Sequence, residues 1–304
     1  MSERVFVTGV TGYLGAAISR RLKAAGYEVW GLTRSEERAA QLEAAGFHAV
    51  VGDVSEPATF RGALNNSDAV VHAAAEHGPH AAKRDQQALH VIRAAVEDGR
   101  VRRVLYTSGI WVHGDTGGRV VDETARPEPL ELVAWRPAHE EVVLDLATLE
   151  AAAIVLRPGM VYGGSRGVFG GWFREARQHG TVHYPGGAQH WSAVHLDDVA
   201  DAYRLALAHA EPGTRYLLTD DSRHTVKDLA EAAAAAAGAR AVAEPADQVL
   251  QRLGAFGAAL LTDSLVSSAR ARRELGWAPR HASFVRSATT LWDEWLSGER
   301  APVG

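Results

Sequence analysis

The chain of 304 residues contains no cysteine. This absence excludes disulfide bonds, catalysis by a thiolate and zinc sites built on cysteine. Long apolar runs are also missing, since no stretch approaches the ~18 uninterrupted apolar residues that a membrane-spanning helix requires. The first apolar run, VFV at residues 5–7, is soon followed by glycine and does not resemble a secretory signal. These absences predict a soluble, cytoplasmic protein.

An excess of positive charge is absent as well. The 32 lysines and arginines are outnumbered by 37 acidic residues, giving a formal net charge of −5, and the arginines are scattered along the chain. Nucleic acids and anionic membranes both bind concentrated positive faces. The sequence therefore predicts a small-molecule substrate, with neither a nucleic acid nor a membrane as partner.

The first half of the chain alternates short apolar runs with longer amphipathic segments. The runs are rich in Val, Ala, Ile and Leu on both faces, as in strands buried between layers of helices. They are RVFVTG, YEVWGL, FHAVVGD, DAVVHAAA, VRRVLYTS and AAIVLRPG. Repeated strand–helix–strand units predict an α/β fold with a doubly wound parallel sheet, the Rossmann fold.

The pattern changes after Gly163, where glycine-rich loops surround a short helix. The chain then returns toward the sheet through HLDDVADAYRLALAHA, and GTRYLLTD and an alanine-rich helix follow. We predict a dinucleotide-binding domain over residues 1–162, rejoined by about residues 190–210. A smaller, partly discontinuous α/β cap over residues 163–304 would bind the substrate.

A glycine motif, GVTGYLG at residues 9–15, follows the first predicted strand directly. Gly9 permits a tight turn, Gly12 allows close approach of a pyrophosphate, and Gly15 allows the helix to pack closely on the strand. The phosphates would bind the free N–H groups at the positive end of that helix. The place of the motif between strand and helix favours a dinucleotide site over a plain tight turn.

The end of the second predicted strand bears on the choice between NAD and NADP. An acidic residue there would bind the ribose hydroxyls of NAD, but this chain has Thr33, Arg34 and Ser35. Arg34 could pair with a 2′-phosphate, helped by the two hydroxyls, and a merely solvated Arg34 is the alternative. We therefore expect NADP as the cofactor, with NAD less favoured.

Further cofactor contacts are expected at later strand ends. Asp53 and Val54 are placed to hold the adenine edge, and the small residues 73–75 leave room for the middle of the cofactor. The residues predicted from these motifs to bind the cofactor are Gly9, Thr11, Gly12, Tyr13, Leu14, Gly15, Thr33, Arg34, Ser35, Asp53, Val54, Ala73, Ala74 and Ala75.

With these motifs the chain resembles the extended short-chain dehydrogenase/reductase superfamily, in its branch similar to nucleotide-sugar epimerases and dehydratases. The resemblance covers nearly the whole length and includes TGVTGYLG, GDV, HAAA, YTSGIWVHG, LRPGMVYGG, VHLDDVADAY and RRELGWAP. It implies a catalytic Ser, followed by a Tyr and a Lys spaced YxxxK. Here these three positions fall on Gly109, Trp135 and His139, so the chain resembles an atypical member.

The loss of the usual groups leaves the proton donor open. An indole does not titrate in the useful range, so Trp135 could only form a wall or stack over a ring. His139 could bond to a ribose hydroxyl and carry a proton near neutral pH, and we favour it. The other candidates are Ser108, His113 and Tyr162, and simple packing in a degenerate site is the alternative.

The segment around Trp135 reads AWRPAHEEVV. Pro137 needs no N–H in the first turn of a helix, so we expect the helix to begin near Arg136. If the family habit holds, the helices carrying Leu89 and Val142 would form a four-helix interface in a homodimer.

Two other motifs suggest different chemistry. Residues 163–167 match the GxSxG pattern of esterases around Ser165, with His195 and Asp197 downstream, but more glycine loop follows where a helix should begin. Two groups of histidines lack the spacing of metal ligands, so we expect solvated loop residues and no metal site. These groups are His72, His77 and His80, and His183, His190 and His195.

The sequence as a whole predicts NADP(H)-dependent oxidoreduction of a small organic carbonyl or alcohol. A redox-neutral epimerase or dehydratase and a non-catalytic NADP(H)-binding sensor or scaffold are the alternatives. Thr107, Ser108, Pro158 and Gly159 would shape the nicotinamide pocket. The aromatics Trp111, Trp172 and Trp191 fit either a ring-bearing substrate or the core of the cap.

Overall fold

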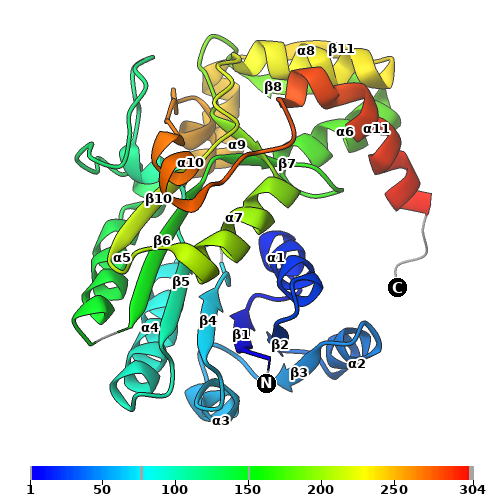
Figure 1. Ribbon diagram of the computed structural model, residues 1–304. Coiled ribbons are helices and arrows are strands. Elements are labelled where there is room, and N and C mark those ends of the chain that lie inside the picture. The colour runs from blue at the N-terminus through cyan, green and yellow to red at the C-terminus, as the bar shows by residue number, and fades with distance from the viewer. Residues whose placement is uncertain (1, 76–77, 150, 301–304) are drawn as a thin grey trace.

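A seven-stranded parallel sheet forms the centre of the protein in a computed structural model, which describes residues 2–75, 78–149 and 151–300. The strand order is β3-β2-β1-β4-β5-β6-β10 (Figure 1). The strands are β1 (Arg4–Thr8), β2 (Glu28–Thr33), β3 (His48–Val51), β4 (Ala69–His72), β5 (Arg103–Thr107), β6 (Ala152–Pro158) and β10 (Thr214–Leu218). The predicted Rossmann fold is confirmed.

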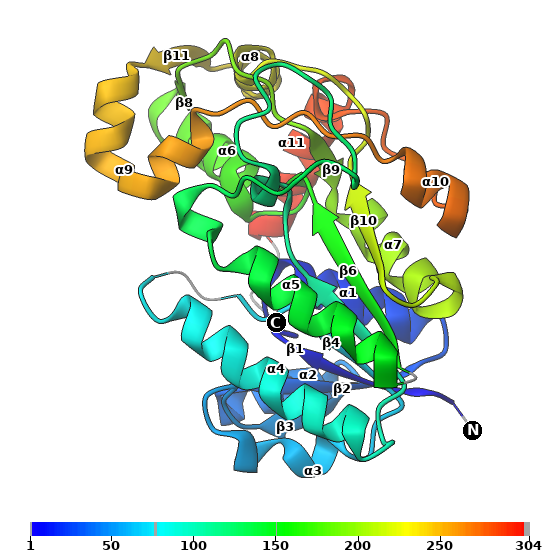
Figure 2. The ribbon, with the colours of Figure 1, turned by 90° about the vertical axis from the view of Figure 1, so that its left-hand side faces the viewer.

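Helices cover both faces of this sheet (Figure 2). One face packs against α1 (Tyr13–Ala24), α7 (Leu196–His209) and α10 (Ala269–Leu275). The other face packs against α3 (Arg61–Leu64), α4 (Ala81–Glu97) and α5 (Arg136–Leu144). The short helix α2 (Glu36–Ala44) contacts β2 and β3 near the edge of the sheet. Because both faces are covered, the strands are apolar on both sides, which explains their continuous hydrophobic runs.

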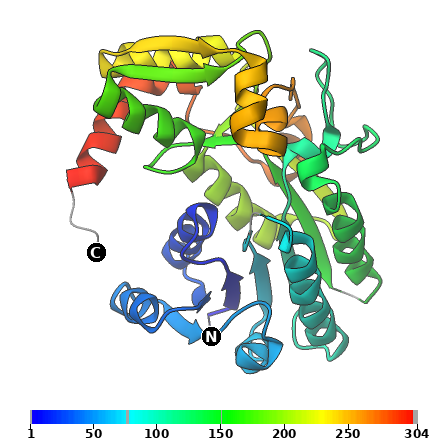
Figure 3. The same ribbon diagram turned by 180° about the vertical axis from the view of Figure 1, so that it is seen from behind.

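The cap lies beyond the carboxyl ends of the strands and has its own aromatic core (Figures 1 and 3). Its elements are α6 (Gly167–His179), β8 (Thr181–Pro185), α8 (Val226–Ala237), β11 (Arg240–Glu244), α9 (Ala246–Leu260) and α11 (Phe284–Arg300). A two-stranded ladder of β7 (Met160–Tyr162) and β9 (Ala193–His195) leads into it. Trp172 and Trp191 are buried and stack at 5.9 Å, so these two tryptophans belong to the cap core.

Short 3-10 turns complete the described elements. They are η1 (Pro57–Thr59), η2 (Ile110–His113), η3 (Glu131–Val133) and η4 (Asp145–Leu149). Helix α5 begins at Arg136 with Pro137 in its first turn, as the position of the proline predicted.

The segment Thr214–Leu218 differs from the expectation that placed it in the cap. It forms β10, which pairs with β6 in parallel and closes one edge of the main sheet. The return of the chain to the Rossmann domain therefore extends past residue 210. The physical reason is that α7 crosses back over the sheet, and a connection of four residues leaves the next apolar run beside β6.

The two helices expected to form a dimer interface are α4, which carries Leu89, and α5, which carries Val142. Leu89 is only 2% exposed and packs toward the sheet, whereas Val142 is 39% exposed. The homodimer stays a prediction. Among the described helices, none combines the length and apolarity needed to cross a membrane.

Candidate functional site

The glycine motif lies where the strand order reverses between β1 and β4, the usual ligand site of an open α/β sheet. Gly9 has a φ of +71°, and a Cβ on it would lie 2.7 Å from the Ala73 carbonyl oxygen. A Cβ on Gly15 would lie 2.1 Å from the Gly9 carbonyl oxygen. The tight turn and the close helix–strand packing therefore require these two glycines.

A groove of about 400 Å³ runs along the carboxyl ends of β1, β2 and β4, and we call it the cofactor groove. It brings together most of the predicted cofactor residues. Its lining is Gly9, Thr11, Gly12, Tyr13, Leu14, Leu32, Thr33, Arg34, Gly52, Asp53, Val54, Ala73, Ala74 and Ala75. Of the predicted residues in the glycine motif and after β2, two lie outside the lining: Gly15 is buried under the turn, and the hydroxyl of Ser35 caps α2. Thr107, His139, Pro158 and Gly159 are also absent from the lining of the groove.

Arg34 and Asp53 form an ion pair in the wall of this groove. Their charged groups are 4.0 Å apart, and the Arg34 side chain is 69% exposed. Partial burial raises the pKa of Asp53, but hydrogen bonds from the Ser55 N–H and hydroxyl hold it below its usual range. Asp53 is therefore ionised at neutral pH and orients the guanidinium over the groove.

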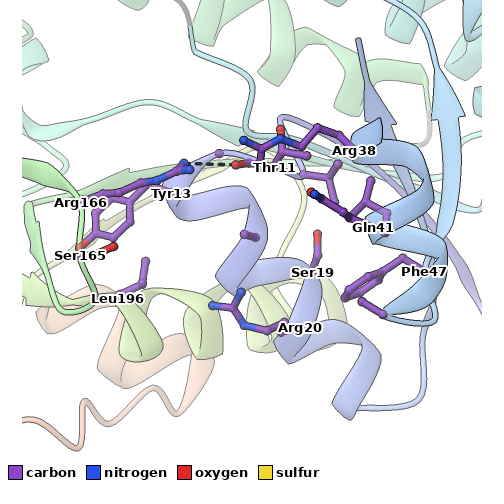
Figure 4. A pocket seen from close by; sticks show the side chains of 16 residues that line it. Thr11, Tyr13, Ser19, Arg20, Arg38, Gln41, Phe47, Ser165, Arg166 and Leu196 are labelled. Atoms are coloured by element: carbon purple, nitrogen blue, oxygen red, sulfur yellow. Dashed lines mark hydrogen bonds between the residues drawn. The ribbon is translucent and has the colours of Figure 1, made fainter. Parts of the chain in front are cut away.

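An outer pocket of about 470 Å³ adjoins the groove, and the two share Thr11, Gly12 and Tyr13 (Figure 4). It lies between α1, α2 and residues 164–166, and its lining includes Arg20, Arg38 and Arg166 but no carboxylate of a described residue. Arg166 donates to the Thr11 carbonyl at 3.2 Å. Arg38 was not among the residues predicted to bind the cofactor. Its position one turn into the helix after β2, close to Arg34, was the available signal.

A second cavity, of about 220 Å³, lies at the carboxyl ends of β5 and β6, and we call it the inner chamber. Most of its wall is apolar. The lining is Leu14, Gly78, Ala81, Ser108, Gly109, Ile110, Trp111, Leu132, Val133, Trp135, Arg136, Pro158, Gly159, Met160 and Val161. Ser108 is 8% exposed, and its Oγ has no hydrogen-bond partner among the described residues. This hydroxyl therefore has unused hydrogen-bonding capacity at the wall of the chamber.

The groove and the chamber are neighbours. Leu14 lines both. A small cavity between them shares Val54 with the groove and Trp135 with the chamber, and its wall includes Asp85. An extended two-ended ligand can therefore lie in the groove and reach the chamber.

Asp85 on α4 is the centre of a buried hydrogen-bond network. It accepts from His139 Nδ1 at 2.6 Å, from the Tyr106 hydroxyl at 3.0 Å and from His72 Nε2 at 3.1 Å. His72 Nδ1 in turn lies 2.7 Å from Thr8 Oγ1. Burial raises the pKa of Asp85, yet the bonds from His139 and His72 hold it well below its usual range. The network thus holds a carboxylate that sequence reasoning did not single out.

Trp135 and His139 pair as their one-turn spacing predicts, with ring centroids 4.8 Å apart. Trp135 lines the chamber, whereas His139 is held on Asp85 and is absent from the chamber wall. Thr107, predicted to shape the nicotinamide pocket, instead accepts hydrogen bonds from Tyr203 on its hydroxyl and from Arg136 on its carbonyl. Pro158 and Gly159 line the chamber as predicted.

The candidates His113 and Tyr162 lie outside the chamber wall. His113 Nε2 is 3.0 Å from a guanidinium nitrogen of Arg157, and burial, with that charge, lowers its pKa to about 4. Tyr162 is buried in the cap core, where its hydroxyl donates to Asp220 at 3.2 Å. Burial raises the pKa of Tyr162 far above its ordinary value. Neither ring is placed to exchange a proton in the chamber.

The residues of the esterase motif and of the two histidine groups have other contacts. Ser165 is exposed in a loop, with no Ser165–His195 hydrogen bond among the described residues, and His195 Nδ1 accepts from the Asp197 N–H instead. The expectation of solvated histidines is wrong for His72 and His195, which are both buried. His77 lies outside the described residues. Ligand atoms of His195, Asp197 and His281 lie within 4.8 Å of one another, but His195 Nε2 faces Gly163, where a Cβ would be 2.5 Å away.

Comparison with known proteins places these features in a family. The model of the NAD dependent epimerase/dehydratase family matches residues 5–218. An uncharacterized protein of Schizosaccharomyces pombe is 30% identical over 291 residues, which cover 93% of this chain and 97% of that protein. A 2-alkyl-3-oxoalkanoate reductase of Shewanella oneidensis is 27% identical over a region that covers 86% of this chain and 72% of that protein. The crystal structure of the Thermus thermophilus UDP-glucose 4-epimerase in complex with NAD has the same fold, with a TM-score of 0.81 and 22% identity. The match covers 96% of this chain and 99% of the epimerase chain.

Proposed function

This chain belongs to the NAD-dependent epimerase/dehydratase family, and from that premise we propose that it is an NADP(H)-dependent oxidoreductase that reduces a carbonyl group in a small, largely apolar molecule. The family description supports a nicotinamide cofactor. The name of the Shewanella relative describes a reductase of a 3-oxo compound, and reduction of a carbonyl is the part of that chemistry that we carry over.

One observation carries the proposal: the cofactor groove lies beside an apolar chamber, with Leu14 lining both, and the chamber wall holds a buried, unpartnered hydroxyl. A dinucleotide in the groove would place its reactive ring against Pro158 and Gly159. Gly159 leaves no room for a side chain, because a Cβ there would lie 2.4 Å from the Ser192 carbonyl oxygen. The ring and a small carbonyl compound would then fill the chamber together.

The bound cofactor supplies the hydride, and the chain's own residues bind and orient the substrate. Ser108 Oγ–H donates to the carbonyl oxygen, where negative charge develops as the hydride arrives. Among the predicted proton donors, His139 fits best, because Asp85 holds its Nδ1–H and leaves Nε2 to exchange a proton. We propose that His139 acts through water or a ribose hydroxyl, since Trp135 stands between its ring and the chamber.

The preference for NADP over NAD is part of the proposal. Arg34 lines the adenosine end of the groove, and Arg38 lines the adjoining pocket beyond Thr11. Both guanidinium groups can approach a 2′-phosphate on the adenosine ribose, and planar guanidinium groups bind phosphate with two hydrogen bonds. The substrate would enter between the Rossmann domain and the cap.

The test is NADPH oxidation with a panel of aromatic and aliphatic aldehydes and ketones. We expect turnover by the wild type and a loss of ~10²-fold in kcat for Ser108→Ala, the size typical of a lost oxyanion donor. Binding of NADPH by this variant should be unchanged, and Ser297→Ala on the surface of α11 should behave as wild type.

Other results would favour the rival functions. Tight NADPH binding without turnover of any carbonyl compound would favour the non-catalytic sensor. Conversion of a nucleotide sugar without net consumption of NADPH would favour the redox-neutral epimerase.

A further inference from the structure

Among the described residues that line the inner chamber, Arg136 is the one with a charge, in a mostly apolar wall. It lies beside Trp111, Trp135 and Met160, and no carboxylate of a described residue lines the chamber. Asp85 is near enough for Arg136 to lower its pKa, but its carboxylate already accepts three hydrogen bonds from other residues. The donors of Arg136 can therefore meet a group that enters the chamber.

The Arg136 side chain is fixed rather than free to swing away. One terminal nitrogen donates to the Thr107 carbonyl at 2.9 Å and lies 3.5 Å from the Tyr106 hydroxyl. The guanidinium also lies 4.6 Å from the centre of the Trp135 ring. Within residues 2–75, 78–149 and 151–300, neither Nε nor the second terminal nitrogen has a hydrogen-bond partner. The guanidinium thus keeps several unused donors on a held side chain.

Arg136 and Ser108 lie on the same wall of the chamber. The carbonyl that Arg136 binds belongs to Thr107, whose next residue is Ser108. Both residues line the chamber, so a small substrate whose oxygen meets the Ser108 hydroxyl can also meet the guanidinium. In a small substrate, the group that meets Arg136 is then close to the reacting carbonyl.

The chemistry of the guanidinium decides which group that is. Its planar donors match the two oxygens of a carboxylate, and such charge-assisted pairs are the strong ones. In a chamber with mostly apolar walls, an unpaired charge is costly, so an anionic partner gains more here than in water. A neutral ester or ketone of the same shape would leave the charge uncompensated.

Building on the proposed reductase function, we propose that Arg136 selects substrates in which a carboxylate lies one or two bonds from the carbonyl that is reduced, that is, 2-oxo and 3-oxo acids. The hydride of NADPH adds to the carbonyl carbon, the C=O electron pair moves to oxygen, and a proton drawn from water completes the hydroxy acid. The carboxylate stays intact and bound to Arg136 throughout.

The experiment compares benzoylformate with its methyl ester, which differ in the charge next to the ketone. We expect the wild type to show at least a tenfold higher kcat/KM for the acid. In Arg136→Met, the acid-to-ester ratio should fall by about 10- to 100-fold, as expected for a lost hydrogen bond to a charged group. Arg136→Lys should keep an intermediate ratio. Arg93→Met on α4, an exposed arginine paired with Glu97, is the matched control and should keep the wild-type ratio.

The outcomes separate this proposal from the reductase function. A wild type that reduces the ester as well as the acid, or a ratio unaffected by Arg136→Met, would overturn the role of Arg136 and leave the reductase intact. If neither compound is reduced, calorimetry with benzoylformate on the NADPH-bound protein tests whether the carboxylate site at Arg136 exists. Binding that Arg136→Met weakens by tenfold or more would support the carboxylate site although the reductase function has failed, and no binding by the wild type would overturn both.

Discussion

The cofactor groove and the inner chamber are built from different parts of the chain. The groove is formed largely by backbone: the turn from Gly9 to Leu14 and the small residues 73–75 lie at neighbouring strand ends. The chamber depends on side chains from distant segments, with Ser108 after β5 and Arg136 at the start of α5. A site made of backbone is recognisable in the local sequence, whereas a site made of side chains depends on packing across the fold.

The largest expected effect tests the backbone side of this comparison. In Gly15→Val, the new Cβ would lie 2.1 Å from the Gly9 carbonyl oxygen, so the helix must move away from the turn. We expect NADPH affinity to fall by at least 100-fold or the protein to lose its fold, measured by calorimetry and circular dichroism. A Cβ on Gly62 would meet nothing within 4 Å, so Gly62→Ala should bind as wild type. Normal binding by the Gly15 variant would show that the turn is not set by this contact.

The next effect tests the buried ion pair that joins α5 to β6, the two elements that carry Arg136 and Pro158 of the chamber. Glu140 on α5 and Arg157 on β6 form an ion pair in which both side chains are only 1% exposed. Glu140→Gln leaves a buried guanidinium without its counter-charge, so we expect a loss of about 3–5 kcal/mol in unfolding free energy by chemical denaturation. Glu141 is 65% exposed, and Glu141→Gln should change stability by less than about 1 kcal/mol. Equal effects of the two variants would contradict the assigned importance of the buried pair.

A smaller effect tests the two arginines near the cofactor groove, Arg34 in its lining and Arg38 in the adjoining pocket. Arg34→Ala and Arg38→Ala should each lower the preference for NADPH over NADH by about tenfold, because each removes a charged donor from the 2′-phosphate. The ratio of the two dissociation constants is the measurement. Lys227→Ala on α8, an exposed cation in the cap, is the control for loss of one charge. An unchanged ratio in both arginine variants would refute the NADP preference.

The smallest effect concerns pH and His113. Burial, followed by the charge of Arg157, lowers the pKa of this imidazole to about 4. The unfolded chain binds a proton on His113 below about pH 6.5, whereas the folded chain does so only near pH 4, so acid favours unfolding across this window. As the pH falls from about 6.5 to 4.5, the free energy of unfolding should decrease in both proteins. We expect this decrease, measured by urea denaturation, to be roughly 1–2 kcal/mol smaller in His113→Asn than in the wild type. Parallel pH curves for the two proteins would show that His113 takes up its proton equally in both states.

The sequence predicted the sheet and the groove because local physics dictates them. The apolar runs have to be buried on both faces, and the glycines at positions 9 and 15 have no room for a Cβ. The segment Thr214–Leu218 was misplaced because an apolar run does not say which sheet it will join. Pairing with β6 decided that, and it depends on the path of α7 over the sheet.

The chamber residues were harder to predict because their roles arise from contacts over long distances. Asp85 lies in the polar stretch KRDQQ, which looks like a solvated helix face, yet it is buried by His72, Tyr106 and His139. Arg136 was interpreted only as the start of a helix. Its importance depends on the Thr107 carbonyl, 29 residues away in the chain.

Two contacts tie the loop after β7 to the glycine-rich turn after β1: the Tyr13 hydroxyl donates to the Gly163 carbonyl at 2.5 Å, and Arg166 donates to the Thr11 carbonyl. Tyr13 and Thr11 belong to the segment that would receive the pyrophosphate, so occupancy there also restrains the entrance to the cap. Steady-state kinetics should accordingly follow an ordered sequence, in which the coenzyme adds first and leaves last.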